Sequence, residues 1–184
     1  MNKIKYSAIA KGILIAVGTA SIITIAILAP NSLQMLKMFG FGKKDYNSKS
    51  VYNSIKHLQK NKLIDITEKD GKTIIKITKN GKSKLLEYEF EDMRIKKPKK
   101  WDSKWRIIGF DIPEKRKKAR EALRHKMKEL GFVRMQKSLF VYPYPCGEEV
   151  EFIGEFFQVY EHIVFIEASS ISNEEYYKQI FELS

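Results

Sequence analysis

The sequence has little of what most enzymes and metal sites require. Among 184 residues there is one cysteine, Cys146, which excludes an internal disulfide and any zinc-finger array. The three histidines lie far apart and lack the spacing of metal ligands. Neither a G-x-x-x-x-G-K-[ST] loop nor a G-x-G-x-x-G turn is present. Phosphate-loop ATPases, Rossmann dehydrogenases and zinc hydrolases are therefore excluded, and the single thiol fits a reducing compartment.

Apolar and aromatic residues, by contrast, are sufficient for folded cores. Hydrophobic residues make up 43% of the chain and charged residues 30%, which is the composition of a globular protein rather than a disordered one. Eleven Phe, nine Tyr and two Trp supply bulky side chains. A chain of this length predicts one ordinary domain or two small ones.

Basic residues dominate the first two-thirds of the chain. The formal net charge is +12, with +13 from residues 1–100, +7 from residues 101–145 and −8 from the remainder. The basic residues 1–145 predict a polyanionic partner. The acidic residues 146–184 are not expected to contact that partner. The alternative is that lysine, the commoner basic residue here, simply fills solvated surfaces.

An uncharged apolar run begins at Gly12 and ends at Ala29. About 18–20 such residues can span a bilayer, so one interpretation is a membrane anchor that holds the rest of the protein at the cytoplasmic face. The other is a buried first helix in a cytoplasmic protein, followed by a strand over residues 22–27, with Gly18 marking the change. Residues 1–30 are therefore treated as a segment of their own.

Residues 31–93 predict a winged helix-turn-helix. A short helix over residues 33–39 precedes a second one that starts at Ser48 or Ser50 and ends near Lys60. Two alternating apolar segments then flank Asp70-Gly71, a strong hairpin-turn signal, and residues 82–91 are expected to be helical. A basic amphipathic helix followed by a basic hairpin is the order in which such domains meet DNA, with the helix in the major groove and the hairpin on the backbone.

The candidate DNA contacts are donors on the polar face of the second helix and at the hairpin tip. They can reach phosphates or base edges. On the helix they are Lys49, Ser50, Asn53, Lys56, His57 and Lys60, and on the hairpin Lys69 and Lys72.

The sequence V-Y-N-S-I-K-H-L-Q-K-N-K-L-I at residues 51–64 resembles the recognition helix and wing entry of many bacterial winged-helix repressors. Winged helices also dock other proteins, so the resemblance leaves that use open. Residues 94–100 follow as a basic linker, expected to be either a strap on phosphates or a solvated spacer.

Residues 101–184 predict a second, ferredoxin-like domain, which makes the chain an α+β protein. The expected order is β-α-β-β-α-β with a terminal helix. Strands are expected over residues 105–111, 132–136, 139–144 and 162–168, and helices over residues 114–130, 147–159 and 173–183, the last capped by Ser172 or Asn173.

Two long motifs in this domain resemble the central domain of PaaX-type transcriptional repressors. They are K-W-R-I-I-G-F-D-I-P-E-K-R at residues 104–116 and L-G-F-V-R-M-Q-K-S-L-F-V-Y-P at residues 130–143. The resemblance implies a DNA-binding transcription regulator that acts on double-stranded DNA as a homodimer. Only about 14 residues follow residue 170, so the ligand-responsive region of that family is expected to be missing or reduced to one helix, and no small-molecule effector is identified.

The PaaX central domain is itself similar to the second CRISPR-associated protein, and this similarity draws attention to Asp111 and Ser138. In that family an acid at the end of the first strand is the proposed ligand of a divalent metal, paired across a dimer twofold. Asp111 would then bind Mg²⁺, with Ser138 at the same site, in a metal-dependent endonuclease or a spacer-integration subunit. The alternative is that Asp111 caps the following helix near Glu114. We expect a regulator without catalytic residues or a cofactor, with the nuclease as the alternative.

Overall fold

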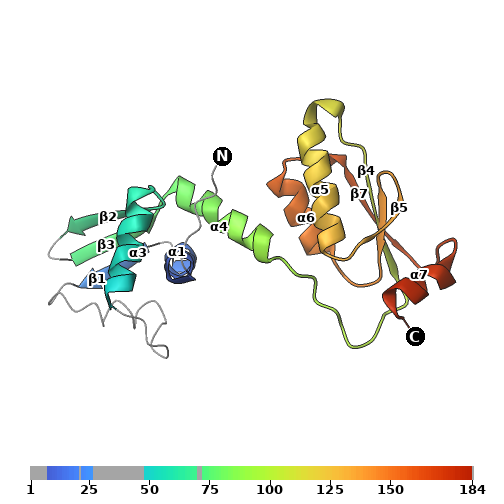
Figure 1. The fold of residues 1–184 in the computed structure, drawn as a ribbon, viewed down its shortest axis with the longest axis horizontal. Coiled ribbons are helices and arrows are strands. Elements are labelled where there is room, and N and C mark those ends of the chain that lie inside the picture. The colour runs from blue at the N-terminus through green and yellow to red at the C-terminus, as the bar shows by residue number, and fades with distance from the viewer. Residues whose placement is uncertain (1–7, 21, 27–47, 70–71, 184) are drawn as a thin grey trace. The chain divides into compact units, whose positions relative to one another are not determined.

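The computed structural model describes residues 8–20, 22–26, 48–69 and 72–183. Helices accompany two antiparallel sheets, which confirms the α+β class. The chain divides into two compact units, Met1–Glu89 (unit 1) and Phe90–Ser184 (unit 2), each described by itself below (Figure 1). The expected helix over residues 33–39 and the turn at Asp70-Gly71 lie outside the described residues.

Unit 1 combines helices with a three-stranded antiparallel sheet of order β1-β3-β2. The described elements are α1 (Ala8–Ala20), β1 (Ile22–Ala26), α3 (Ser48–Lys60), β2 (Ile64–Lys69), β3 (Lys72–Ile77) and α4 (Lys79–Asp92), which crosses the division between the units.

The apolar run near the amino terminus forms part of this unit. Ile13, Leu14 and Val17 of α1 are fully buried in one cluster with residues of α3, and β1 pairs with β3. Burying large aliphatic side chains is strongly favourable, which explains why a helix without an acidic or basic stripe packs inside a domain. Among the described residues, no helix is long and apolar enough to cross a membrane.

A close backbone contact fixes the start of α4. The Thr78 hydroxyl donates to the Lys62 carbonyl oxygen at 2.6 Å and accepts the Gly81 N–H at 3.0 Å, as a helix-capping residue does. A Cβ at Gly81 would lie 2.1 Å from the Leu63 carbonyl oxygen. Glycine at position 81 therefore lets α4 pass directly against the segment between α3 and β2.

Unit 2 contains a four-stranded antiparallel sheet of order β5-β6-β4-β7. Its elements are β4 (Trp105–Phe110), η1 (Glu114–Arg116), α5 (Lys117–Glu129), β5 (Val133–Gln136), β6 (Leu139–Tyr142), α6 (Gly147–Phe156), η2 (Tyr160–His162), β7 (Ile163–Ala168) and α7 (Glu174–Phe181).

The two faces of this sheet are covered differently. On one face Ile108 and Phe140 pack with Leu123 of α5 and Ile153 of α6, and both helices lie on the same side of the sheet (Figure 1). On the other face Trp105 packs against Tyr177 of α7. Cys146 lies in the first cluster, and burial raises the pKa of its thiol to about 12.

Two helix starts differ from the sequence-based expectation. The helix predicted over residues 114–130 begins as the 3₁₀ turn η1 and becomes α-helical at Lys117, because Arg116 adopts φ −109° and ψ 26°. The terminal helix has Asn173 at its cap position, one of the two residues predicted there, but the side chain does not cap the helix. The backbone of Asn173 lies in the left-handed region, φ 58°.

A buried arginine joins the start of β4 to the end of β6. Arg106 is 2% exposed, yet its guanidinium donates to both carboxylate oxygens of Asp102, at 2.7 and 2.5 Å, and to the Pro143 carbonyl oxygen at 2.9 Å. The hydrogen bond lowers the pKa of Asp102 and raises that of Arg106. These charge-assisted hydrogen bonds fix the position of Asp102, just before β4, relative to the sheet.

Candidate nucleic-acid interface

Helix α3 separates its apolar and polar side chains onto two faces. Val51, Ile55 and Leu58 point into the core of unit 1, at the i, i+4 and i+7 positions of one stripe. The opposite face consists of the predicted DNA contacts, all exposed: Lys49, Ser50, Asn53, Lys56, His57 and Lys60. The fold thus brings these six side chains together on one solvent-facing surface, which we call the α3 face.

Tyr52 is a member of this surface that the sequence analysis missed. Its side chain is 51% exposed, and the amino group of Lys56 lies 4.7 Å from its ring centroid. A cation over an aromatic face is held by electrostatic attraction, so Tyr52 orients Lys56. The i, i+4 spacing of the two residues in a predicted helix was the signal that could have identified the pair.

The end of α3 leads directly into the hairpin. The Asn61 side-chain amide donates to the His57 carbonyl oxygen at 2.7 Å, and Lys62 turns the chain with φ 56°. The Leu63 N–H then donates to the Leu58 carbonyl oxygen at 2.9 Å. This C-terminal arrangement satisfies the last carbonyls of the helix and starts β2 at Ile64.

The two predicted wing lysines face each other across the hairpin. Lys69 ends β2 and Lys72 begins β3, and their Cα atoms are register partners in the antiparallel pair. Both side chains are exposed. Two lysines that are register partners concentrate positive charge at this end of the hairpin, and an anion bound there would reduce their repulsion.

Asp111 and Ser138 lie in unit 2, at one end of strand β4. The Phe110 N–H donates to the Ser138 carbonyl oxygen and the Asp111 N–H to the His162 carbonyl oxygen, both at 3.0 Å. The Ser138 hydroxyl accepts from Arg124 at 3.3 Å. These contacts bring the two predicted residues to the same end of the sheet. Asp111 is exposed, and among the described residues no hydrogen bond joins its side chain to that of Ser138.

Asp111, the predicted metal ligand, has a positively charged neighbour on α5. The guanidinium of Arg120 is near enough that the charge of Asp111 adds to the raised pKa of Arg120, whose main cause is the hydrogen bond to Glu114. Within the described ranges, no group of three or more His, Cys, Asp or Glu side chains could hold a metal ion. A neighbouring guanidinium competes with a divalent cation for the carboxylate.

The expected capping by Asp111 is not observed either. The first turn after β4 has Pro113 at its cap position and no side-chain hydrogen bond to its backbone. Arg120 instead donates to the Ile112 carbonyl oxygen at 3.0 Å and to Glu114 at 2.7 Å. An arginine therefore secures this turn, and not the aspartate at the strand end.

Comparison with known protein families finds a similarity that lies within unit 2. Residues 98–180 match the family model described as the PaaX protein central Cas2-like domain. This match confirms the resemblance that the two motifs of residues 104–116 and 130–143 indicated. A search of curated proteins gives no match to the chain.

Proposed function

We propose that the chain, whose residues 98–180 carry a PaaX central Cas2-like domain, is a PaaX-like regulator that binds double-stranded DNA through unit 1 and forms a homodimer through unit 2. Transcriptional repression is the output that this assignment implies. The single observation that carries the DNA-binding part is the α3 face, where one helix presents three lysines, a histidine and an asparagine to solvent.

The order of elements in unit 1 supports a winged helix. A helix and a strand precede α3, and the β2–β3 hairpin follows it at once, with β1 added to the sheet beside β3. In such a domain the second of the DNA-contacting helices enters the major groove and the hairpin lies on the backbone. With α3 as that helix, Asn53 and His57 would meet base edges, and Lys69 and Lys72 would meet phosphates.

The order of elements in unit 2 supports a ferredoxin-like domain. Strand, helix, two strands, helix and strand follow each other from β4 to β7, with β4 and β6 central in the sheet. The last strand in the sheet order, β7, carries three exposed apolar side chains, Val164, Phe165 and Ile166. Contiguous exposed apolar residues at a sheet edge favour association, so we place the homodimer contact there.

Cleavage of DNA is the competing function, and it rests on Asp111. Because Arg120 and Arg124 occupy the neighbourhood of Asp111 and Ser138, we propose a structural role for both residues. Incubation of the full-length protein with duplex DNA and Mg²⁺ distinguishes the two functions. Intact, shifted DNA supports the regulator, whereas chelator-sensitive cleavage that is lost in Asp111→Ala would establish the nuclease.

The DNA-binding proposal predicts that Lys56→Ala weakens binding. We expect a lower affinity for a duplex from the protein's own upstream region, and a salt slope reduced by about 0.9 if Lys56 meets a phosphate, or relaxed sequence preference if it meets a base. Titration on gels at several salt concentrations, with a scrambled duplex alongside, measures both. The control is Lys178→Ala, which removes one positive charge from an ion pair with Glu175 in the acidic end of the chain. An affinity and slope equal to the control would exclude α3 from the interface.

A further inference from the structure

Helix α5 of unit 2 is unusual in how its charges are paired. Each of the three acids on η1 and α5 is engaged by a cation that lies partly or fully beneath the surface. Arg120 donates to Glu114 and Arg124 to Glu121, each at 2.7 Å, and Lys126 donates to Glu129 at 3.0 Å. The side chains of these cations are 18%, 16% and 2% exposed. The carboxylates are thus paired mainly with partly or fully buried cations, and of the exposed lysines on α5 only Lys117 also meets one of them, at 3.7 Å from Glu114.

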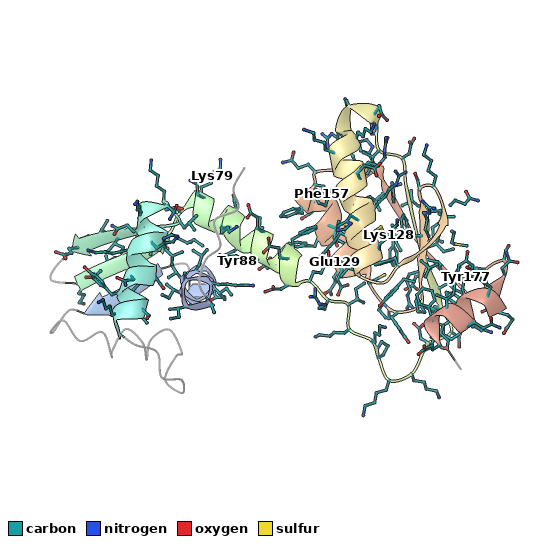
Figure 2. The ribbon with its side chains drawn as sticks, viewed as in Figure 1. Lys79, Tyr88, Lys128, Glu129, Phe157 and Tyr177 are labelled. Carbon is teal, nitrogen blue, oxygen red and sulfur yellow. The ribbon has the colours of Figure 1, made fainter. Side chains whose placement is uncertain are left out.

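The outward side of α5 keeps its positive charge as a result. Lys117, Lys118 and Lys128 are all exposed, and we call these three residues the α5 cationic stripe; Lys128 is labelled on this helix in Figure 2. Within the part of the chain that the structure describes, no carboxylate pairs with Lys118 or Lys128, and Lys117 has only a 3.7 Å contact with the exposed Glu114. The first and last lysine are eleven positions apart, about 16 Å along a helix.

We propose that the α5 cationic stripe is a second nucleic-acid contact, which binds the phosphodiester backbone of duplex DNA without reading its sequence. The inference rests on the proposed DNA-binding function and extends it to a surface of unit 2. Lysine suits this use because a compact ammonium on a flexible stem meets phosphates without demanding one geometry. Three such contacts would release counterions and add to affinity for any duplex.

The surface of α5 favours DNA over a membrane. A helix that lies on a lipid surface buries apolar side chains between its basic ones. None of the exposed large hydrophobic side chains among the described residues belongs to α5, whose exposed positions are three lysines, His125, Glu121 and Glu129. The opposite, apolar side is occupied by the core through Leu123 and Met127.

The charges elsewhere in unit 2 restrict how a polyanion can approach the α5 cationic stripe. Acids dominate α6 and α7, including Glu148, Glu151, Glu155 and Glu175, all exposed. One polyanion would therefore be attracted to α5 and repelled by the other two helices, which orients its approach.

The test compares two double variants of the full-length chain. Lys118→Gln with Lys128→Gln removes two charges from the stripe, and Lys104→Gln with Lys178→Gln removes two charges that are already paired with Glu167 and Glu175. We expect the stripe variant to bind the upstream duplex and a scrambled duplex more weakly by the same factor, with the salt slope reduced by up to about 1.8. Arginine at positions 118 and 128 should restore the wild-type slope.

Several outcomes would overturn the inference. A stripe variant whose slope equals that of the control variant removes α5 from the interface while leaving the α3 proposal intact. Loss of binding to vesicles of anionic phospholipid, without a change toward DNA, would assign the stripe to a membrane instead. A reduced slope together with an unaffected Lys56→Ala variant would support the stripe and reject the α3 face. Wild-type protein that binds neither duplex rejects both.

Discussion

At the scale of single residues, the positions that matter most for folding are those where two backbones or two charges meet. Gly81 allows α4 to pass the segment between α3 and β2, and Asp102 neutralises the buried Arg106. Neither residue belongs to the amphipathic patterns that reveal helices and strands. Their roles depend on contacts between segments, which periodicity does not encode.

Gly81→Ala should destabilise the protein although it lies in a helix. Glycine to alanine in a helix interior normally gains up to about 1 kcal/mol. Here the new Cβ would overlap the Leu63 carbonyl oxygen, so we expect a loss of about 1–3 kcal/mol, as for overpacked sites. Urea unfolding followed by circular dichroism measures the change. Gly147→Ala at the start of α6, where the new Cβ would lie 4.0 Å from the Phe165 ring, is the control and should be nearly neutral.

Asp102→Asn should destabilise unit 2 and change its acid sensitivity. The substitution leaves buried Arg106 with Glu167 and two carbonyl oxygens, so we expect a loss of about 1–3 kcal/mol at neutral pH. Because the folded-state pKa of Asp102 lies below 3.8, its stabilisation is present above that pH and disappears as the pH falls through the lower folded value. Urea midpoints between pH 2 and 7 should therefore converge for the two proteins at low pH. A constant difference across this range would contradict the assignment.

At the scale of elements, amphipathic patterns predicted the structure well where each face of an element has its own chemistry. The stripe of Val51, Ile55 and Leu58 defined α3, and alternating isoleucines defined β2 and β3. Helix α1 was harder, because an apolar run without a polar face looks the same whether lipid or protein surrounds it. The charges of α5 were visible in the sequence, but which acid each cation binds required the structure.

The candidate site divides in the same way. Exposure of the six predicted α3 residues follows from helical periodicity and was predictable. The pairing of the Tyr52 ring with Lys56 was not predicted, because an amphipathic pattern separates polar from apolar faces and does not show how an aromatic ring on the polar face contacts its neighbours. The guanidinium groups near Asp111 and Ser138 come from the neighbouring helix α5, and their direction toward the strand ends is set by tertiary packing that helical periodicity does not encode.

The position of α1 in the core predicts a large effect of truncating its buried side chains. Leu14→Ala should lower the free energy of unfolding by about 2–5 kcal/mol, because the Leu14 side chain is completely buried in the core that α1 shares with α3. Ile15, on the same helix but 43% exposed, supplies the control, and Ile15→Ala should cost much less. Thermal unfolding of unit 1 measures the difference. Equal effects at the two positions would be incompatible with a helix packed through one side.

At the scale of the whole molecule, self-association is the property that the proposed function needs and that unit 2 is expected to supply. Ile166 is 47% exposed on β7 and is the register partner of Ile107, so it lies on the sheet face opposite α5 and α6. Ile166→Lys should convert a dimer into a monomer in analytical ultracentrifugation and weaken binding to a two-site duplex. Leu86→Lys, at a similarly exposed apolar residue of α4, should leave the dimer intact. A dimer that survives Ile166→Lys would locate the contact elsewhere.

The burial of Cys146 has a practical consequence. The thiol is 1% exposed and its pKa is raised to about 12, so at neutral pH it stays protonated and does not react with maleimides. A cysteine introduced on an exposed surface position, such as residue 56 on α3 or residue 118 on α5, would then be labelled selectively without removing the native one. A fluorophore at either position would report DNA binding at one surface at a time, and two labels together would give the distance between the units in solution.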